Sequence, residues 1–246
     1  MDTIKRKIQE VITKMDLLEI VNKYNIKINA EQEKKLNEFI KMMLETNKHT
    51  NLTRIVERDD INVKHLLDSL MLLTTNLIKD GEKLLDIGAG AGFPSTPLAI
   101  CSDIKVVQIE ASLKKVEFLT KVANELNLNI TPLHARAEEL GKTAEFREKY
   151  DVVTARAVTT LDILSELCLP FVKTNGHFIA LKGDDVEQEL SNAENAIKTI
   201  GGEIYKIKKY TLENQYKRAL IIIKKISKTP NKYPRSYAKM KKTTPI

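Results

Sequence analysis

From residue 81 onward, short apolar runs alternate with longer amphipathic stretches, and this alternation constrains the fold more than any other feature of the chain. Alternating strands and helices predict a mostly parallel sheet covered by helices on both faces. The predicted strands are 83–87, 105–110, 130–134, 150–155, 176–182, 203–212 and 218–226. Helices are predicted after Pro94 and at 113–126, 161–172 and 185–200.

The last two predicted strands are joined by the short polar segment "ENQYK", without a helix. So short a connection requires an antiparallel pair. We therefore expect an α/β fold of six or seven strands that is parallel except for a terminal antiparallel hairpin.

The first 80 residues carry no strand pattern and are predicted to be helical. Apolar residues recur at three- and four-residue spacing from Ile4 to Val21. A second helix is predicted to begin near Asn29, which has N-cap character and is followed three positions later by Gln32, and a third to run through 61–73. We expect three parts, namely a helical cap (1–80), a core (81–226) and a basic tail (227–246).

The net charge of +7 is concentrated at the end of the chain. Eight lysines and arginines, and no acidic residue, lie from Lys224 onward, so the rest of the chain is close to neutral. Such a basic strip indicates a polyanionic partner, with nucleic acid the first choice. Tyr233 and Tyr237, interleaved with the lysines, are suited to stacking on RNA bases. The alternative is a solvated tail that only aids solubility.

The remaining composition is that of a cytoplasmic protein. Cys101 and Cys168 are not spaced as a metal site, and both stand in apolar surroundings, so we expect no metal and no disulfide framework. No secretory signal is recognisable, and the longest apolar run is too short to span a membrane.

Three glycines follow the first predicted strand in the stretch "LLDIGAGAGFPS". Glycine permits positive φ and lets a ligand approach the main chain closely. The spacing is G-x-G-x-G, neither the dinucleotide pattern G-x-G-x-x-G nor a P-loop. Asp86 stands just before the loop, where a carboxylate suits a ligand that carries a positive charge and little negative charge.

A second acid, Glu110, ends the next strand, 24 residues after Asp86, where a carboxylate can accept hydrogen bonds from ribose hydroxyls. In "ARAEEL", after the third strand, the main chain of Ala137 or the carboxylate of Glu138 is placed to meet an adenine. The alternative is that these acids only cap helices. The whole arrangement is typical of the seven-stranded, Rossmann-like class I methyltransferases, so the expected cofactor is S-adenosylmethionine.

The segment after the fourth strand, "TARAV", indicates which atom is methylated. It lacks the N/D-P-P-Y/F tetrapeptide of enzymes that methylate exocyclic amines, and Cys168 lies in an apolar helical stretch typical of core. A ring nitrogen such as guanine N7 needs no general base, so positioning and electrostatics would suffice. Arg156 is placed to orient the ligand or to contact guanine O6 and N7, or else it pairs with a structural acid.

Eight segments in order resemble one family, the bacterial small-subunit ribosomal RNA guanine-N7 methyltransferases, also called glucose-inhibited division protein B. They are "NLT", "HLLDSL", "DIGAGAGFPS", "KKVEFL", "RAEEL", "VTARAV", "ALKG" and "KYPRS". The resemblance implies methyl transfer from S-adenosylmethionine to N7 of a guanine in the decoding region of 16S rRNA. The implied partner is 16S rRNA or the 30S subunit, and we expect a cytoplasmic monomer.

The resemblance and the spacing together give a set of candidate site residues. Those implied to contact the cofactor by motif are Gly88, Phe93, Ala137, Glu138 and Arg156, and spacing adds Asp86, Gly90, Gly92 and Glu110. Arg156 is also the candidate catalytic residue. RNA contacts are predicted for Asn51, Lys182, Lys232 and Arg235.

The end of the chain departs from the family. "RSYAKMKK" places Ala238 and Met240 where the family often has the glycine and proline of an R-x-G-x-P turn, so the tail is expected to follow a different path. Two other functions stay open: a methyltransferase of the same fold that acts on a small molecule or protein, and a non-enzymatic RNA-binding protein.

Overall fold

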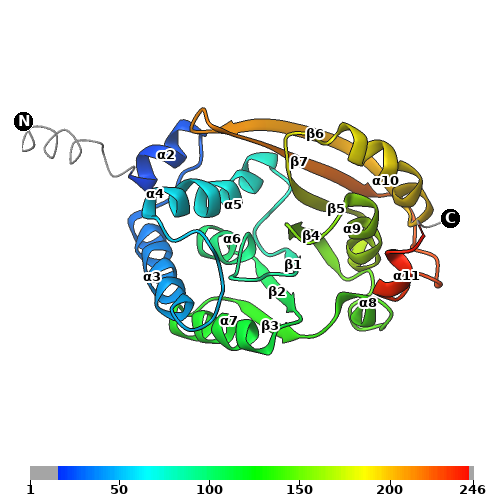
Figure 1. Ribbon diagram of the computed structural model, residues 1–246, viewed down its shortest axis with the longest axis horizontal. Helices are drawn as coiled ribbons and strands as arrows, with labels where there is room; N and C mark the ends of the chain where they lie inside the picture. The colour runs from blue at the N-terminus through cyan, green and yellow to red at the C-terminus, as the bar shows by residue number, and fades with distance from the viewer. Residues whose placement is uncertain (1–15, 244–246) are drawn as a thin grey trace, which may run out of the picture.

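The computed structural model describes residues 16–243 and places them around a seven-stranded sheet with helices on both faces (Figure 1). The strand order is β3-β2-β1-β4-β5-β7-β6. The strands are β1 (Lys83–Ile87), β2 (Lys105–Glu110), β3 (Ile130–His134), β4 (Tyr150–Arg156), β5 (Val172–Gly183), β6 (Gly202–Leu212) and β7 (Tyr216–Lys225). The predicted strands are confirmed, except that β5 begins well before residue 176.

The pairing of these strands confirms the predicted topology. Neighbours from β3 to β5 are parallel, while β7 pairs antiparallel with both β5 and β6. The order in which strands are added changes direction at the centre of the sheet. β1, β2 and β3 follow one another toward one edge, whereas β4 lies on the other side of β1 and starts the other half. In sheets of this kind a ligand binds outside the carboxyl ends of the strands at that switch point.

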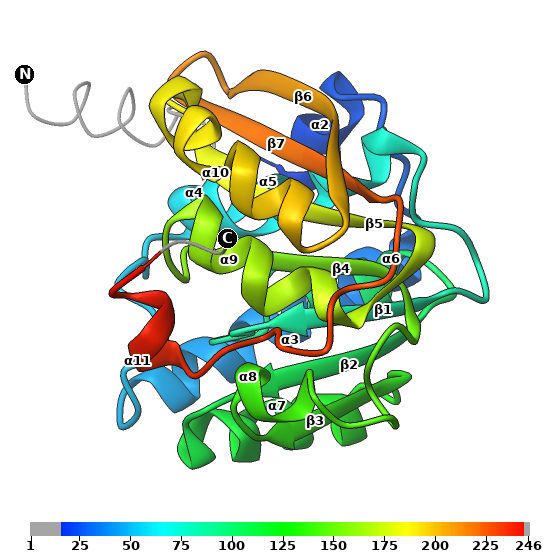
Figure 2. The same cartoon turned by 90° about the vertical axis from the view of Figure 1, so that its right-hand side faces the viewer.

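The crossover helices divide between the two faces of the sheet. Helices α6 (Ser95–Cys101) and α7 (Leu113–Glu125) lie on one face, and α8 (Ala137–Leu140), α9 (Leu161–Cys168) and α10 (Glu187–Thr199) on the other, which faces the viewer in Figure 2. The helix predicted through residue 172 ends at Cys168, becomes the 3₁₀ turn η3 (Leu169–Phe171) and leads into β5. Pro170 has no N–H to donate, so the helix cannot continue through it.

The N-terminal segments form a helical cap over α6 and α7 (Figure 1). They are α2 (Leu17–Lys23), α3 (Ala30–Asn47), α4 (Arg58–Ile61), the π-helix η1 (Asn62–Leu67), α5 (Asp68–Leu70) and the 3₁₀ helix η2 (Met71–Thr75). The predicted capping box at Asn29 is confirmed, because its side chain accepts from Gln32 N at 2.9 Å and Gln32 Oε1 accepts from Asn29 N at 2.8 Å. The first part of the predicted stripe, residues 4–15, lies outside the described residues.

The third predicted helix contains an unexpected π turn at Asn62–Leu67. In a regular α-helix the N–H of Asp68 would donate to the carbonyl of Lys64, but here it donates to the carbonyls of Val63 and His65. The Lys64 carbonyl instead accepts a hydrogen bond from Arg156 Nη1 at 3.1 Å. The wider turn therefore joins the cap to the end of β4.

The cap and the core share one hydrophobic cluster around the glycine turn. The rings of Phe39, on α3, and Phe93, in the turn, lie 5.1 Å apart. A Cβ added to Gly92 would approach Thr96 Oγ1 to 2.5 Å and Phe39 Cζ to 3.3 Å. Glycine is therefore required at position 92 by its φ of 94° and by close packing against α6, with Phe39 of the cap also in contact.

After β7 the chain returns along the face covered by α9 and ends in the short helix α11 (Tyr237–Met240) beside α8 (Figure 2). Ala238 lies inside α11 and does not adopt positive φ. Tyr233 and Met240 are buried in the core cluster of this face. Within residues 16–243, no helix combines the length and apolarity required to cross a bilayer.

Candidate active site

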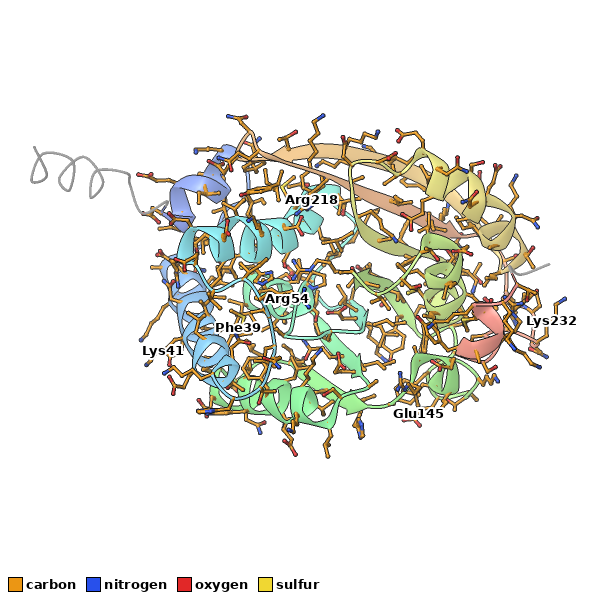
Figure 3. All side chains as sticks on the ribbon, in the orientation of Figure 1. Phe39, Lys41, Arg54, Glu145, Arg218 and Lys232 are labelled. Carbon is orange, nitrogen blue, oxygen red and sulfur yellow. The ribbon has the colours of Figure 1, made fainter. Side chains whose placement is uncertain are left out.

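Two pockets open at the carboxyl ends of the parallel strands, and consecutive residues after β4 line both of them. The glycine-side pocket, of about 180 Å³, includes Gly88, Glu110, Ala137, Glu138, Val158 and Tyr237 in its lining. The cationic pocket, of about 400 Å³, includes Lys64, His65, Asp68, Arg156, Lys182 and Arg218. In Figure 3, Arg218 lies between β7 and α5.

At Gly88 the glycine turn lines the glycine-side pocket with main chain only. Gly88 has φ of 72°, and its N–H donates to the carbonyl of Ile109 on the neighbouring strand at 2.8 Å. A Cβ on Gly88 would lie 2.9 Å from Val158 Cγ2. Any other residue at this position would therefore need a strained conformation and would push aside the Val158 side chain in the loop that follows β4.

Glu110 is held in place by two main-chain groups. Its Oε2 accepts from Gly90 N at 3.0 Å and its Oε1 accepts from Ser112 N at 2.9 Å. The side chain is buried, yet it lines the glycine-side pocket. Each carboxylate oxygen has a second lone pair, so a fixed Glu110 can still accept hydrogen bonds from two neighbouring hydroxyl groups.

Asp86 is fully buried at the end of β1, behind the glycine turn. Its Oδ2 accepts from Ser95 Oγ at 2.5 Å and from Ser95 N at 3.3 Å, and Ser95 Oγ in turn accepts from Gln108 Nε2 at 2.8 Å. Within residues 16–243, Asp86 Oδ1 has no hydrogen-bond partner. Burial raises the pKa of Asp86 to about 6. The group is thus an ionised, incompletely satisfied carboxylate at neutral pH.

Arg156 closes β4 and is held from three directions in the cationic pocket. Nη1 donates to the Lys64 carbonyl and lies 3.4 Å from Asp68 Oδ2, while Nη2 lies 3.2 Å from His65 Nδ1. Its guanidinium carbon is 5.1 Å from the centre of the Phe93 ring. Burial lowers the pKa of Arg156, and the nearby Asp68 opposes that shift. The arginine therefore stays charged and fixed in orientation.

His65 links Arg156 to the loop that contains "NLT". An arginine can only donate, so His65 Nδ1 accepts and its Nε2–H donates to Thr53 Oγ1 at 2.9 Å. The imidazole also stacks on Phe93, with ring centres 4.4 Å apart. Burial and the charge of Arg156 lower the pKa of His65 to about 3. His65 is thus neutral at physiological pH, and both ring nitrogens are engaged.

Not all of the predicted cofactor residues line the glycine-side pocket. Gly88, Glu110, Ala137 and Glu138 do, whereas Arg156 belongs to the cationic pocket. The others form the support beneath, and they are Asp86, Gly90, Gly92 and Phe93. The buried position of Cys168, whose pKa burial raises well above its usual range, confirms the interpretation that it is core.

The four residues predicted to bind RNA lie in different settings. Asn51 and Lys232 are exposed, and Lys182 lines the cationic pocket, where its Nζ donates to Glu189 Oε1 at 2.6 Å. Arg235 makes a forked pair with the buried Glu166, with Nη2–Oε2 at 2.7 Å and Nε–Oε1 at 2.9 Å. Because Glu166 already neutralises its charge inside the protein, we no longer propose Arg235 as an RNA contact.

Several pocket residues were not identified from the sequence. Lys64, Asp68 and Arg218 come together only through the tertiary fold: Asp68 Oδ1 accepts from Tyr210 OH at 2.9 Å and lies 3.9 Å from Arg218 Nε. The segment "HLLDSL" was singled out, but nothing in its spacing pointed to Asp68 in particular. Tyr237 was seen only as a residue suited to stacking on RNA.

Comparison with protein families gives a match over most of the chain. The model described as rRNA small subunit methyltransferase G matches residues 32–221. A relative named ribosomal RNA small subunit methyltransferase G, from Lactobacillus acidophilus, is 42% identical over 220 residues, which cover 87% of this chain and 92% of the relative. A protein of the same name from Brevibacillus brevis is 41% identical over 227 residues, covering 91% and 95%.

Solved structures with lower identity support the fold. A SAM-dependent methyltransferase from Aquifex aeolicus has a TM-score of 0.53 at 17% identity, covering 70% of this chain and 96% of that one. TYW2 from M. jannaschii, solved in complex with AdoMet, has a TM-score of 0.51 at 17% identity, covering 65% and 77%. The sheet and its helices are therefore those of the class I methyltransferases.

Proposed function

Because the chain belongs to the rRNA small subunit methyltransferase G family, we propose that it transfers a methyl group from S-adenosylmethionine to N7 of a guanine in the decoding region of 16S rRNA. The observation that carries this proposal is the pair of adjoining pockets at the switch point of the sheet. Ala157 lines the cationic pocket and the next residue, Val158, lines the glycine-side pocket. A methyl donor and an anionic acceptor would thus meet at the end of β4.

The residues around the glycine turn fit S-adenosylmethionine. Gly88 lines the pocket with main chain only, and the fixed carboxylate of Glu110 suits the two ribose hydroxyls. Ala137 and Glu138 would face the adenine at the opposite wall. Asp86, with one unsatisfied oxygen, adds negative potential for the cationic end of the ligand.

The bound cofactor would supply an electrophilic methyl group, and the protein needs only to bring a nucleophile to it. Guanine N7 has a free lone pair, so no proton has to be removed before attack. This agrees with His65, which is neutral, has both nitrogens engaged and serves to hold Arg156. Arg156, held in a fixed orientation, would position the acceptor in line with the methyl group.

The cationic pocket supports RNA as the acceptor. Lys64, Arg156, Lys182 and Arg218 line this pocket around the carboxylate of Asp68. Lys64 and Lys182 also pair with Asp60 and Glu189, so these groups together leave a surplus of one positive charge. A splayed-out guanosine offers phosphate oxygens to such a site, and its O6 can accept a hydrogen bond from an arginine while N7 keeps the lone pair that attacks the methyl group. Asn51 and the exposed Lys232 are proposed to extend this contact along the RNA.

The proposal extends to the setting in which the protein works. We propose a cytoplasmic monomer that acts on 16S rRNA or on the 30S subunit. In this division of labour, residues 81–226 hold the cofactor while the cap (1–80) and the tail (227–246) flank the RNA. No group of three or more His, Cys, Asp or Glu residues within 16–243 forms a candidate metal site.

The test is transfer of a labelled methyl group from S-adenosylmethionine to unmethylated 30S subunits and, separately, to deproteinised 16S rRNA. We expect label in a single guanine, and a loss of rate of about 100-fold or more in Arg156→Ala, because the acceptor is then no longer held in line with the methyl group. Arg156→Lys keeps the positive charge but lacks the several N–H donors of the planar guanidinium. Lys198→Ala, at an exposed position on α10, is the surface control.

The outcomes separate the three candidate functions. Label that appears in a protein or small molecule and never in RNA would overturn the acceptor assignment. Salt-dependent RNA binding without any affinity for S-adenosylmethionine would instead indicate a non-enzymatic RNA-binding protein.

A further inference from the structure

The tail after β7 supplies part of the glycine-side pocket. Tyr237, the first residue of α11, lines this pocket together with Gly88, Glu110 and Glu138, which come from the core. The pocket thus has a wall that comes from a segment outside the sheet and its crossover helices. The sequence predicts contacts of this segment with RNA, through its charge and its tyrosines, and not with the cofactor.

A buried ion pair fixes the tail two residues before Tyr237. Glu166, on α9, is fully buried, and it accepts from Arg235 N at 2.6 Å as well as from the Arg235 guanidinium. Leu167, the residue after Glu166, lines the glycine-side pocket. The residue that anchors the tail and a residue that lines the pocket are therefore neighbours on one helix.

A second anchor holds the tail on the other side of Tyr233. The guanidinium of Arg147 donates to the carbonyls of Thr229 at 2.7 Å, Tyr233 at 2.8 Å and Gly141 at 2.9 Å. Gly141 follows α8, so Arg147 ties the tail to the segment that carries Ala137 and Glu138. Tyr233 and Met240 are buried on either side of Tyr237. The position of Tyr237 is thus determined by packing and hydrogen bonds along the whole tail.

Tyr237 itself presents an aromatic surface that is only partly covered. Its side chain is half-buried, and Lys241 Nζ lies 4.9 Å from the centre of its ring. Small or aliphatic side chains, among them Ala135, Val158 and Leu167, line the same pocket. An aromatic ring among aliphatic neighbours is the feature that a purine recognises, because every base has a face on which it can stack.

We propose that Tyr237 is a cofactor-binding residue and that the docked tail forms the aromatic wall of the adenosine site. This inference rests on the proposed function, since it takes the glycine-side pocket as the site of S-adenosylmethionine. It gives the tail a role in holding the cofactor in addition to any role of its lysines toward RNA.

The test is the affinity of the full chain for S-adenosylhomocysteine, measured by isothermal titration calorimetry, so that no turnover is needed. Tyr237→Ala is expected to weaken binding about tenfold, as loss of one stacking ring does. Tyr237→Phe keeps the ring and should bind like the wild type. Tyr205→Ala, a tyrosine on β6 that is 58% exposed, is the matched control and should also be unaffected.

A second measurement reports on the tail directly. Hydrogen exchange should slow at the amides of residues 237–241 when S-adenosylhomocysteine binds to the wild type, because the ligand would hold Tyr237 against the pocket. Arg235→Ala, which removes the anchor at Glu166, is expected to weaken binding without any change to the pocket residues of the core. Exchange that is unchanged by the ligand would count against the proposal.

The results distinguish this inference from the function beneath it. Wild-type affinity in Tyr237→Ala would overturn the inference and leave the proposed function intact. If Tyr237→Ala and Tyr237→Phe lose the same affinity for S-adenosylhomocysteine, the aromatic ring is not the group that contacts the ligand. A wild-type protein that binds neither S-adenosylhomocysteine nor S-adenosylmethionine would overturn the proposed function itself.

Discussion

The two pockets share the end of β4 but are built in opposite ways. The glycine-side pocket combines the main chain of the glycine turn with Glu110, Glu138, several aliphatic side chains and Tyr237, and the N–H groups of Gly90 and Ser112 fix Glu110. The cationic pocket is made of long charged side chains from the cap, β4, β5 and β7. The first suits one small ligand of fixed shape, and the second suits a flexible polyanion.

Phe93 and Arg156 join the two pockets. Phe93 follows the glycine turn, and its ring lies against both His65 and the guanidinium of Arg156. A change on one side can therefore reach the other through packed, buried groups. Lining residues that contact neither Phe93 nor Arg156 have no such connection. A substitution of one of them should therefore change ligand affinity in its own pocket and leave affinity in the other pocket unchanged.

The largest expected effect concerns Asp86 and the pH dependence of stability. Burial raises its pKa from 3.8 to about 6, so the folded protein holds a proton that the unfolded chain releases. The stability that this group contributes is fully present below pH 3.8 and is lost as the pH rises through about 6, a change of about 3 kcal/mol in the free energy of unfolding. Asp86→Asn cannot titrate, so its stability relative to wild type should rise by that amount from pH 3.5 to 7.

Urea denaturation across this pH range measures the difference, with the exposed Asp103→Asn as a matched control. Parallel stability curves for the wild type and Asp86→Asn would contradict the assigned titration. The pH dependence of stability that comes from His65 has the opposite sign. Its pKa is lowered from 6.5 to about 3 in the folded protein, so its contribution to stability is lost as the pH falls.

A slightly smaller effect is expected for Glu110→Ala, which tests the glycine-side pocket alone. Two hydrogen bonds to a charged group would be lost, and affinity for S-adenosylmethionine should fall about 100-fold. RNA affinity, measured by filter binding on the same preparation, should not change. Glu125→Ala, on exposed α7, serves as control. A parallel loss of RNA affinity would show that the two pockets are not separable.

The smallest effect is expected for Arg218→Ala, which tests the cationic pocket alone. Loss of one phosphate contact should weaken RNA binding about tenfold and reduce the slope of log affinity against log salt by about 1. Cofactor affinity should stay at the wild-type value. Its neighbour Lys217, which is exposed, gives the matched variant Lys217→Ala. If the slope of log affinity against log salt is unchanged in Arg218→Ala, Arg218 does not contact an RNA phosphate.

The sequence predicted the glycine-side pocket better than the cationic pocket, and the reason is locality. Gly88, Glu110 and Glu138 each follow a strand, and the carboxyl ends of parallel strands meet at one edge, so spacing alone brings these residues together. The capping box at Asn29 was predictable for the same reason, because both partners lie within one helical turn.

Features that depend on distant partners were missed or misread. Arg235 looked like an RNA contact because it stands among lysines, but it pairs with Glu166, 69 residues away in the chain. Arg218 gave no signal, since its place beside Asp68 depends on the β7 pairing and on the cap together. The π turn at Asn62–Leu67 has an ordinary helical pattern of apolar residues, so periodicity could not distinguish it from an α-helix.

The docked tail has a consequence for the order in which the molecule becomes functional during synthesis. Every strand, the glycine turn and Glu110 precede Tyr237 in the chain, and domains fold from the N-terminal side as they emerge from the ribosome. A nascent chain that has formed β7 would thus have a complete sheet but an adenosine site open on one side. Translation of the last segment, and not folding of the sheet, would then be the event that completes the enzyme.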